Sequence, residues 1–255
     1  MKFSALSSGS SGNCFYVSNR DSAILIDAGI SCKQIVEKLA YLGESPTKIR
    51  GIFVTHEHID HTRGVDVFAR EFNIPIYATK GTIKNSFLCS DENLINNIKN
   101  DETTLVGGME VEAFSKAHDV SDPVSFRVSN GKTISVITDI GHSCENVAES
   151  ISDSDFLVME ANHDLTMLEN GPYPLFLKKR IASDVGHISN LHSGLAVLEH
   201  GKSRLKNVVL AHLSEKNNTP LMALSTFNSL IRERRDFHPK VSLSLRDSAT
   251  LLFRV

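Results

Sequence analysis

The sequence predicts an α/β protein in which two β-sheets pack face to face with helices on the outside. Two observations predict this class. Short apolar runs typical of strands occur in both halves of the chain, and helical segments separate them. No linker, charged block or low-complexity tract interrupts the 255 residues, which suffice for one sizeable core, so we expect one domain over 1–255. The pattern alone leaves other α/β arrangements open.

The expected strands are short apolar runs bounded by turn residues, at 2–6, 13–18, 22–27, 51–54, 74–78, 109–115, 124–129, 133–138, 155–159 and 207–211. We expect the turn-forming tripeptide Asn19-Arg20-Asp21 to join the second and third strands as a hairpin. The Ser/Gly stretch 7–12 resembles a cloning linker, but its place between two strands favours a native turn.

The expected helices follow the helical period and are bounded by stop and start signals, at 32–42, 60–72, 143–151, 190–200 and 218–233. Gly43 ends the first of them, and Asn73 and Pro75 end the second. Thr219-Pro220 supplies the N-cap and the first helical residue of the last one.

Composition excludes several classes of protein. The apolar runs are far shorter than the ~20 residues that span a bilayer, and residues 1–6 lack the apolar core of a secretory signal. We therefore expect no membrane association and a cytoplasmic location. The four cysteines form no Cys-x-x-Cys pair, which predicts reduced thiols. A net charge of −3 gives no overall footprint for nucleic acid, so a local patch or bound metals would have to hold such a partner.

The most informative motif is His56-Glu57-His58-Ile59-Asp60-His61, directly after the apolar strand 51–54. Residues two apart on a strand or loop point the same way, so His56 and His58 can grip one cation. Asp60 and His61 begin the next helix and can turn toward a second cation. Imidazole and carboxylate suit Zn²⁺ best, with Mn²⁺ or Fe²⁺ as alternatives. A polar loop with clustered histidines is the other interpretation, and three of 11 histidines in six positions argue against it.

Two adjacent cations need more ligands, which have to converge from other strand ends. His118, Asp139 and His212 each follow an expected strand. Each of them alone is more often a turn or cap residue. Taken with the histidine motif, they give a set large enough for two ions.

In this order the five motifs resemble the metallo-β-lactamase superfamily over nearly the whole chain. The resemblance implies a four-layer αβ/βα sandwich with two divalent metal ions at one edge and a hydroxide shared between them. It assigns His56, His58 and His118 to the first ion, Asp60, His61 and His212 to the second, and Asp139 to both as a bridge. Asp60 would also orient the hydroxide.

Two departures narrow the subclass. Antibiotic-cleaving relatives carry a cysteine near the position of Asp139, whereas Cys144 lies five residues later. Flavodiiron relatives replace the second histidine of the first motif by glutamate, and His58 is present here. The resemblance therefore points to the hydrolytic, phosphodiesterase-rich branch.

Two further residues resemble the RNase Z pattern. Glu160 ends the strand 155–159, and His187 precedes the helix 190–200. In that pattern the glutamate orients the histidine, which contacts the scissile phosphate and stabilises charge or protonates the leaving oxygen. The alternative interpretation is a turn carboxylate and a capping or core-facing histidine.

Within this superfamily, the amino-acid sequence resembles the YycJ/WalJ family more closely still. The stretches that carry this resemblance are Ser8–Cys14, Thr55–His61, Glu160–Asp164 and His212–Asn218. The family implies a cytosolic nuclease with 5′-to-3′ exonuclease action on DNA. The long tRNA-gripping arm of RNase Z and the large insertion of the β-CASP nucleases are both absent from the sequence.

His163, Asn217 and Asn218 follow metal-edge strands and are candidates for substrate contact, with turn formation as the equal alternative. The basic runs Lys178–Arg180 and Arg232–Arg235 could contact a phosphate backbone, and solvated faces are the favoured interpretation. Two rival functions remain at this point, a thioester or lactone hydrolase of the glyoxalase-II type and a non-catalytic metal-binding regulatory module. The sequence does not indicate the oligomeric state.

Overall fold

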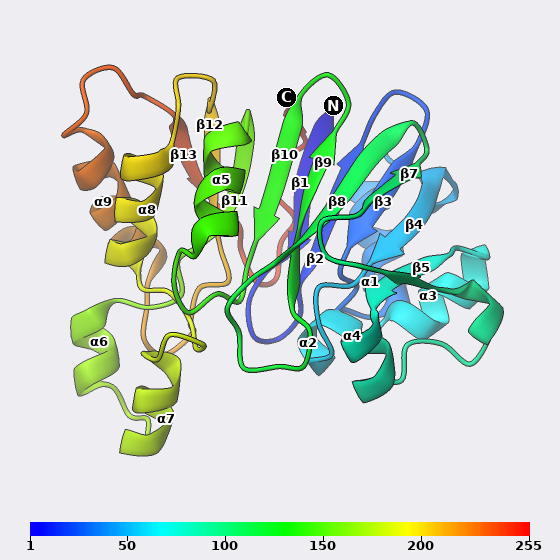
Figure 1. Ribbon diagram of the computed structural model, residues 1–255, viewed down its shortest axis with the longest axis horizontal. Coiled ribbons are helices and arrows are strands. Elements are labelled where there is room, and N and C mark those ends of the chain that lie inside the picture. Colours follow the sequence, from blue (N-terminus) through cyan, green and yellow to red (C-terminus); the bar gives the residue numbers. More distant parts are fainter. The chain divides into compact units, whose positions relative to one another are not determined.

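The computed structural model describes residues 1–255 (Figure 1). The chain forms two compact units. Unit 1 comprises Met1–Ser115, Val120–Lys132 and Leu245–Val255, and unit 2 comprises Lys116–Asp119 and Thr133–Ser244. None of the helices combines the length and the hydrophobicity needed to span a bilayer. That 1–255 acts as one domain stays a prediction.

Unit 1 contains a seven-stranded mixed sheet. Its strands lie in the order β14 (Phe253–Arg254), β1 (Lys2–Ser7), β2 (Cys14–Ser18), β3 (Ala23–Ile26), β4 (Ile49–Phe53), β5 (Ile76–Thr79) and β6 (Ile95–Ile98). β2 and β3 pair antiparallel with Ser18 opposite Ala23, which confirms the predicted hairpin. β3 to β6 are parallel, so the residues that follow β3 and β4 meet at one edge of the sheet.

The helices of unit 1 are α1 (Cys32–Tyr41), α2 (Ile59–Thr62), α3 (Val65–Phe72) and α4 (Lys80–Asn85). The predicted continuous helix 60–72 is wrong, because the chain breaks between α2 and α3 at Gly64. The Gly64 amide donates to the carbonyl of Ala28 at 2.7 Å. A Cβ on Gly64 would lie 2.0 Å from the carbonyl oxygen of Ile30. The loop after β3 thus occupies the space that a continuous helix with side chains would need.

The rest of unit 1 includes the antiparallel strands β7 (Thr103–Val106), β8 (Met109–Ser115) and β9 (Val124–Ser129). Two short 3₁₀ turns lie at Pro46–Lys48 and Glu92–Leu94. The strands β6, β7 and β14 did not emerge from the sequence, because they are short and carry few consecutive apolar residues.

Unit 2 contains four parallel strands, β10 (Thr133–Ile137), β11 (Phe156–Glu160), β12 (Asn207–Ala211) and β13 (Lys240–Leu243). Their helices are α5 (Glu145–Asp153), α6 (Leu165–Asn170), α7 (Leu175–Ile181), α8 (Asn190–His200) and α9 (Pro220–Ile231). The hydroxyl of Thr219 accepts from the Met222 amide, which confirms the predicted cap of the last helix. Since the strands are parallel, the residues after β10, β11 and β12 lie at one edge.

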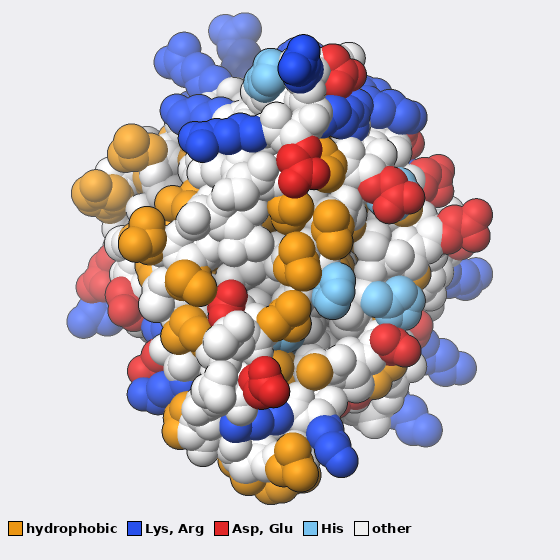
Figure 2. All heavy atoms as spheres, turned by 90° about the vertical axis from the view of Figure 1, so that its left-hand side faces the viewer, with side chains coloured by type: hydrophobic (Ala, Val, Ile, Leu, Met, Phe, Trp, Pro, Cys, Tyr) orange, Lys and Arg blue, Asp and Glu red, His pale blue; other side chains and the backbone are white.

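Helices α6 to α9 form one side of unit 2, and Figure 2 looks onto that side. Hydrophobic side chains gather along its middle with histidines beside them, and lysines and arginines gather at the top of the view and also lie around its lower part. Its exposed apolar side chains include Phe176 on α7, Leu195 on α8 and Leu221 on α9. Apolar surface that is exposed in this way marks a candidate binding surface.

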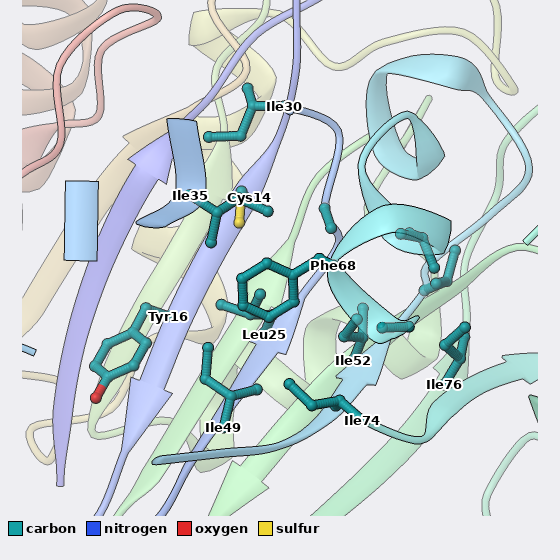
Figure 3. Close-up of a cluster of buried hydrophobic side chains, with 14 of the residues drawn as sticks. Cys14, Tyr16, Leu25, Ile30, Ile35, Ile49, Ile52, Phe68, Ile74 and Ile76 are labelled. Atoms are coloured by element: carbon teal, nitrogen blue, oxygen red, sulfur yellow. The ribbon is translucent and has the colours of Figure 1, made fainter. Parts of the chain in front are cut away.

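The core of unit 1 lies between its sheet and helices α1 and α3. Phe68 of α3 and Ile35 of α1 point toward Leu25 of β3 and Ile52 of β4, and all four side chains are fully buried (Figure 3). Burial of each such side chain contributes about 1.5–3 kcal/mol. This packing fixes the ends of β3 and β4, from which the histidine motif starts.

Candidate metal centre

The histidine motif of unit 1 lies where the sheet gives way to α2. β4 ends at Phe53, and the motif begins three residues later at His56. His58 is the N-cap of α2, and Asp60 and His61 lie in its first turn. The structure thus brings together the four predicted ligands His56, His58, Asp60 and His61, which we call the unit 1 cluster.

Asp27 orients two rings of this cluster and was not predicted from the sequence. It follows β3, is fully buried, and accepts the Nδ1 hydrogen of His61 with 2.7 Å between Nδ1 and Oδ2. It also accepts hydrogen bonds from the amide and hydroxyl of Thr55 at 2.8 and 2.9 Å. The Thr55 hydroxyl oxygen, which lies 3.0 Å from Nδ1 of His56, then accepts from that ring. Because Nδ1 carries the hydrogen in both rings, Nε2 of each ring keeps the lone pair that can bind a cation.

The geometry of His56 and His58 fits a shared cation. Nε2 of His56 lies 3.1 Å from Nδ1 of His58. Two imidazole nitrogens bound to one tetrahedral Zn²⁺ at 2.0–2.1 Å would lie about 3.3 Å apart. The two donor atoms of the predicted pair thus already converge at the separation that one ion requires.

Asp60 and His61 converge in the same way, with 3.4 Å between Oδ2 and Nε2. The amide of Asn13 lies beside both, 3.3 Å from the Asp60 oxygen and 3.1 Å from the His61 nitrogen. This approach depends on Gly29, because a Cβ there would lie 1.6 Å from the carbonyl oxygen of Asp60. The backbone of the β3 loop therefore packs directly against α2.

A second group of donors lies at the strand ends of unit 2. Asp139 follows β10, Glu160 ends β11, and His212 follows β12. His187 comes from the loop before α8. One potential ligand atom of each of these four residues lies within 4.8 Å of the others. We call Asp139, Glu160, His187 and His212 the unit 2 cluster.

Glu160 organises the unit 2 cluster. Its Oε1 accepts from Nδ1 of His187 at 2.8 Å and from Nδ1 of His212 at 2.9 Å. Its Oε2 accepts from the amide of Ile140 at 2.7 Å. Burial by itself would raise the pKa of Glu160, but the charges and hydrogen bonds of the two histidines outweigh it and lower that pKa to about 2. Glu160 is therefore ionised, and both histidines are held with Nδ1 protonated.

His118, also in unit 2, faces the same strand edge. The amide of Gly141 donates to the carbonyl of Ala117 at 2.9 Å, and Nζ of Lys116 donates to the carbonyl of Thr138 at 2.7 Å. These bonds fix the His118 segment to the end of β10. Nδ1 of His118 lies 3.3 Å from the carbonyl oxygen of Gly186, which can accept its hydrogen. Burial lowers the pKa of His118 well below its ordinary value, so the ring is neutral, the form that binds metals.

Three non-glycine residues at these strand ends adopt the left-handed backbone region. The φ angles are 59° at Asp27, 55° at Asp139 and 55° at His212. This region is disfavoured for residues with a Cβ by roughly 1–2 kcal/mol. The chain accepts this strain where it turns a carboxylate or imidazole toward the edge of a sheet.

The three residues predicted to contact substrate lie close to the unit 2 cluster in sequence. Asn218 is 5% exposed, and its amide bonds to Ala161, Asn162 and Asn190. These bonds tie the loop after β12 to the loop after β11. His163 and Asn217 are also buried, and substrate contact by all three stays a prediction.

Every member of both clusters could be predicted from the sequence, whereas the roles of Asp27, Asn13 and Thr55 could not. Asp27 carries the signal that identified Asp139, a carboxylate directly after an apolar strand. Asn13 and Thr55 offer no comparable signal, because their roles depend on which residues fold against them. That the two clusters and His118 share two ions stays a prediction.

The comparisons with known proteins show which superfamily the chain belongs to. The family model of the metallo-beta-lactamase superfamily matches residues 8–141. The chain belongs to this superfamily.

Two curated relatives are similar over most of their length. "Exodeoxyribonuclease YycJ" of Bacillus anthracis is 35% identical over 243 residues, which cover 92% of this chain and 90% of the relative. "Exodeoxyribonuclease WalJ" of Streptococcus pneumoniae is 36% identical over 231 residues, which cover 88% and 86%. The predicted resemblance to the YycJ/WalJ family is confirmed.

A solved structure shows the same fold. The metallo-beta-lactamase fold protein YhfI from Bacillus subtilis superposes with a TM-score of 0.73 over 98% of each chain, at 14% identity. The predicted fold class, the α/β sandwich of this superfamily, is therefore confirmed.

Proposed function

We propose that this chain is a metal-dependent exodeoxyribonuclease that degrades DNA in the 5′-to-3′ direction. Similarity to two exodeoxyribonucleases over about nine-tenths of the chain supports the substrate class. The structural observation that carries the proposal is the 2.8 Å hydrogen bond from His187 to the ionised carboxylate of Glu160. It supplies an oriented proton donor beside a group of metal-binding side chains.

Two divalent metal ions are part of the proposal, with Zn²⁺ favoured and Mn²⁺ or Fe²⁺ as alternatives. Following the motif order of the superfamily, His56, His58 and His118 would hold one, Asp60, His61 and His212 the other, and Asp139 both. When bound, such ions polarise the phosphate and make water nucleophilic near neutral pH. Asp139 and Glu160 are buried carboxylates, and together with Asp60 and the imidazoles of both clusters they are donors of the type that such ions bind.

The chain's own residues divide the remaining work. Asp60 and Asp139 orient the attacking water and accept its hydrogen bonds. Glu160 is a positioning residue, since it acts through the rings of His187 and His212. The side chain of His187 is 23% exposed, against 3% for His212, so His187 is the one that a substrate can reach. Nδ1 of His187 donates to Glu160. The hydrogen on Nε2 of His187 can therefore stabilise the negative charge of the phosphate or be transferred to the leaving oxygen.

This proton donor favours a phosphodiester over the rival thioester substrate. A sugar alkoxide is a poor leaving group and needs a proton as the bond breaks, whereas a thiolate leaves without one. A residue that is oriented by a buried, ionised carboxylate would be superfluous in a thioesterase. The intact donor set likewise argues against a non-catalytic regulatory module.

We also propose a cytoplasmic location. All four cysteines are free thiols, and burial raises the pKa of Cys14 above its ordinary value, which keeps that thiol unreactive. Free thiols are typical of a reducing compartment.

The test is cleavage of single-stranded DNA, RNA and a thioester by the purified chain supplied with Zn²⁺ or Mn²⁺. DNA labelled at its 5′ end should release labelled mononucleotide at once, and DNA labelled at its 3′ end should release label last. Release in the opposite order would contradict the polarity. Turnover of the thioester alone would contradict the nuclease function.

A further inference from the structure

A pocket of about 390 Å³ lies in unit 2 outside both clusters. Its apolar lining includes Leu195 and Ala196 in the middle of α8 and Ile188, which lies two residues before that helix begins. Its polar lining includes the imidazoles of His142 and His192. The size is in the range of sites for small molecules.

Two parts of the pocket lining are adjacent in sequence to residues that take part in the proposed chemistry or bond to one that does. Gly141 and His142 follow directly on Ile140, whose amide bonds to Glu160. Ile188, which also lines the pocket, directly follows His187 in the chain, and adjacent Cα atoms are about 3.8 Å apart. The pocket lining thus begins one residue away from His187 along the chain.

The lining includes no lysine or arginine, whereas it includes the acidic residues Asp184 and Glu199. A phosphate group would meet no fixed positive charge. A flat, uncharged ring with amino groups fits better. Its faces can pack on the apolar residues and the imidazoles, and its amino hydrogens can bond to the acidic side chains.

Each of these two imidazoles has its own hydrogen-bond partner, so we do not interpret the pocket as another metal site. Nδ1 of His142 lies 2.9 Å from the carbonyl oxygen of Asp184. Nδ1 of His192 lies 3.0 Å from the hydroxyl of Ser189. These contacts hold the two rings in place as walls.

We propose that this pocket binds one nucleobase of the DNA substrate, in the nucleotide next to the phosphate that is cleaved. The inference rests on the proposed function and adds a base-binding site to it. It explains why apolar Leu195 stays 41% exposed at the pocket, where a base can cover it. An exonuclease gains from such a site, because a base held there aligns the next phosphate for each round of cleavage.

The first test measures binding without cleavage. Deoxyadenosine, which has no phosphate, is titrated into the full chain after metal removal, and the imidazole protons are followed by NMR. Saturable shifts are expected for His142 and His192 and none for the exposed His238. Leu195→Asp should weaken binding at least tenfold. The matched control is Leu221→Asp, on an exposed leucine of α9 outside the pocket, and it should leave binding unchanged.

The second test measures the KM for DNA. Leu195→Asp and the pocket-filling Leu195→Trp should each raise the KM for single-stranded DNA about tenfold, with kcat changed less than twofold. Both variants should cleave an abasic strand with the same KM as the wild type, because that strand has no base that the pocket could bind.

The outcomes separate this inference from the proposed function. DNA cleavage with no imidazole shifts, or equal effects of Leu195→Asp and Leu221→Asp, would overturn the base pocket alone. Deoxyadenosine binding in the pocket of a chain that cleaves no phosphodiester would support the base site and overturn the proposed nuclease.

Discussion

The imidazole of His61 donates its Nδ1 hydrogen to the carboxylate of Asp27, with 2.7 Å between the two atoms and both side chains fully buried. His61 is a proposed metal ligand and Asp27 is not. The carboxylate fixes which ring nitrogen keeps its lone pair, and so fixes the ligand atom. The same relationship recurs in unit 2, where Glu160 holds His212 through Nδ1.

Asp27→Asn should weaken metal binding about 10- to 100-fold, because a neutral amide accepts less strongly from His61 and can turn its own NH₂ group toward Nδ1. Asparagine tolerates the φ of 59° at this position, so the backbone should be retained. Competition for Zn²⁺ against a chromophoric chelator measures the effect. Asp21→Asn, an exposed change, is the control. Equal affinity in both variants would contradict the orienting role.

His187→Ala should lower kcat for DNA about 100-fold or more while changing KM less than threefold, because the proposed proton donor acts as the leaving oxygen departs. The bound metal content should stay unchanged, since His187 is not among the proposed ligands. A variant that loses DNA affinity but keeps its kcat would show that His187 only binds substrate. His238→Ala serves as the control.

Glu160→Gln should impair both histidines at once. The carboxylate accepts from His187, His212 and the Ile140 amide, and a carboxamide cannot accept from all three with its single oxygen. A buried donor left without an acceptor destabilises the fold by about 1–3 kcal/mol. Urea unfolding measures that loss, and the cleavage rate should fall at least as far as in His187→Ala. Wild-type stability and rate would refute the central position of this carboxylate.

The histidine motif and the three later strand ends could be predicted because the signal is local. An apolar strand that runs directly into His56, Asp139 or His212 can be recognised without knowing what packs nearby. Asp27 shares that signal, yet its role became visible only through its contact with His61. The break of the helix at Gly64 could not be predicted, because the loop that passes beside it comes from 28–30, more than thirty residues earlier in the chain.

The parts of unit 2 that the sequence did not reveal have a similar cause. α6 and α7 are helices of six and seven residues, too short to show a helical period. β13 carries alternating polar residues and pairs only with β12 within unit 2. The pocket on α8 depends on segments near 142, 184 and 192, which no motif connects.

Glu44 should stabilise unit 1 in a pH-dependent way. Its carboxylate is 4% exposed and accepts from Nζ of Lys2 and Lys48 and from the hydroxyl of Tyr16, each at 3.0 Å. Burial alone would raise the pKa of Glu44, but these hydrogen bonds and the Lys2 charge lower it below its ordinary value of 4.5. Glu44→Gln should therefore destabilise the chain by about 1–3 kcal/mol at neutral pH.

The sign of the pH effect follows from that lowered pKa. The contribution of Glu44 is fully present above the ordinary value and is lost as the pH falls through the lower, folded-state value. The difference in unfolding free energy between wild type and Glu44→Gln should shrink on acidification. A difference that grows in acid would contradict the assignment. Glu37→Gln, on an exposed helical carboxylate, should show little difference at any pH.

The most direct test of the central claim joins metal content to cleavage of 5′-labelled single-stranded DNA. The chain treated with a chelator should release no mononucleotide, and adding Zn²⁺ or Mn²⁺ should restore release as two ions bind per chain. Asp139→Ala should stay folded, bind fewer ions and release none. Undiminished cleavage by the metal-free chain or by Asp139→Ala would contradict the account of a two-metal nuclease.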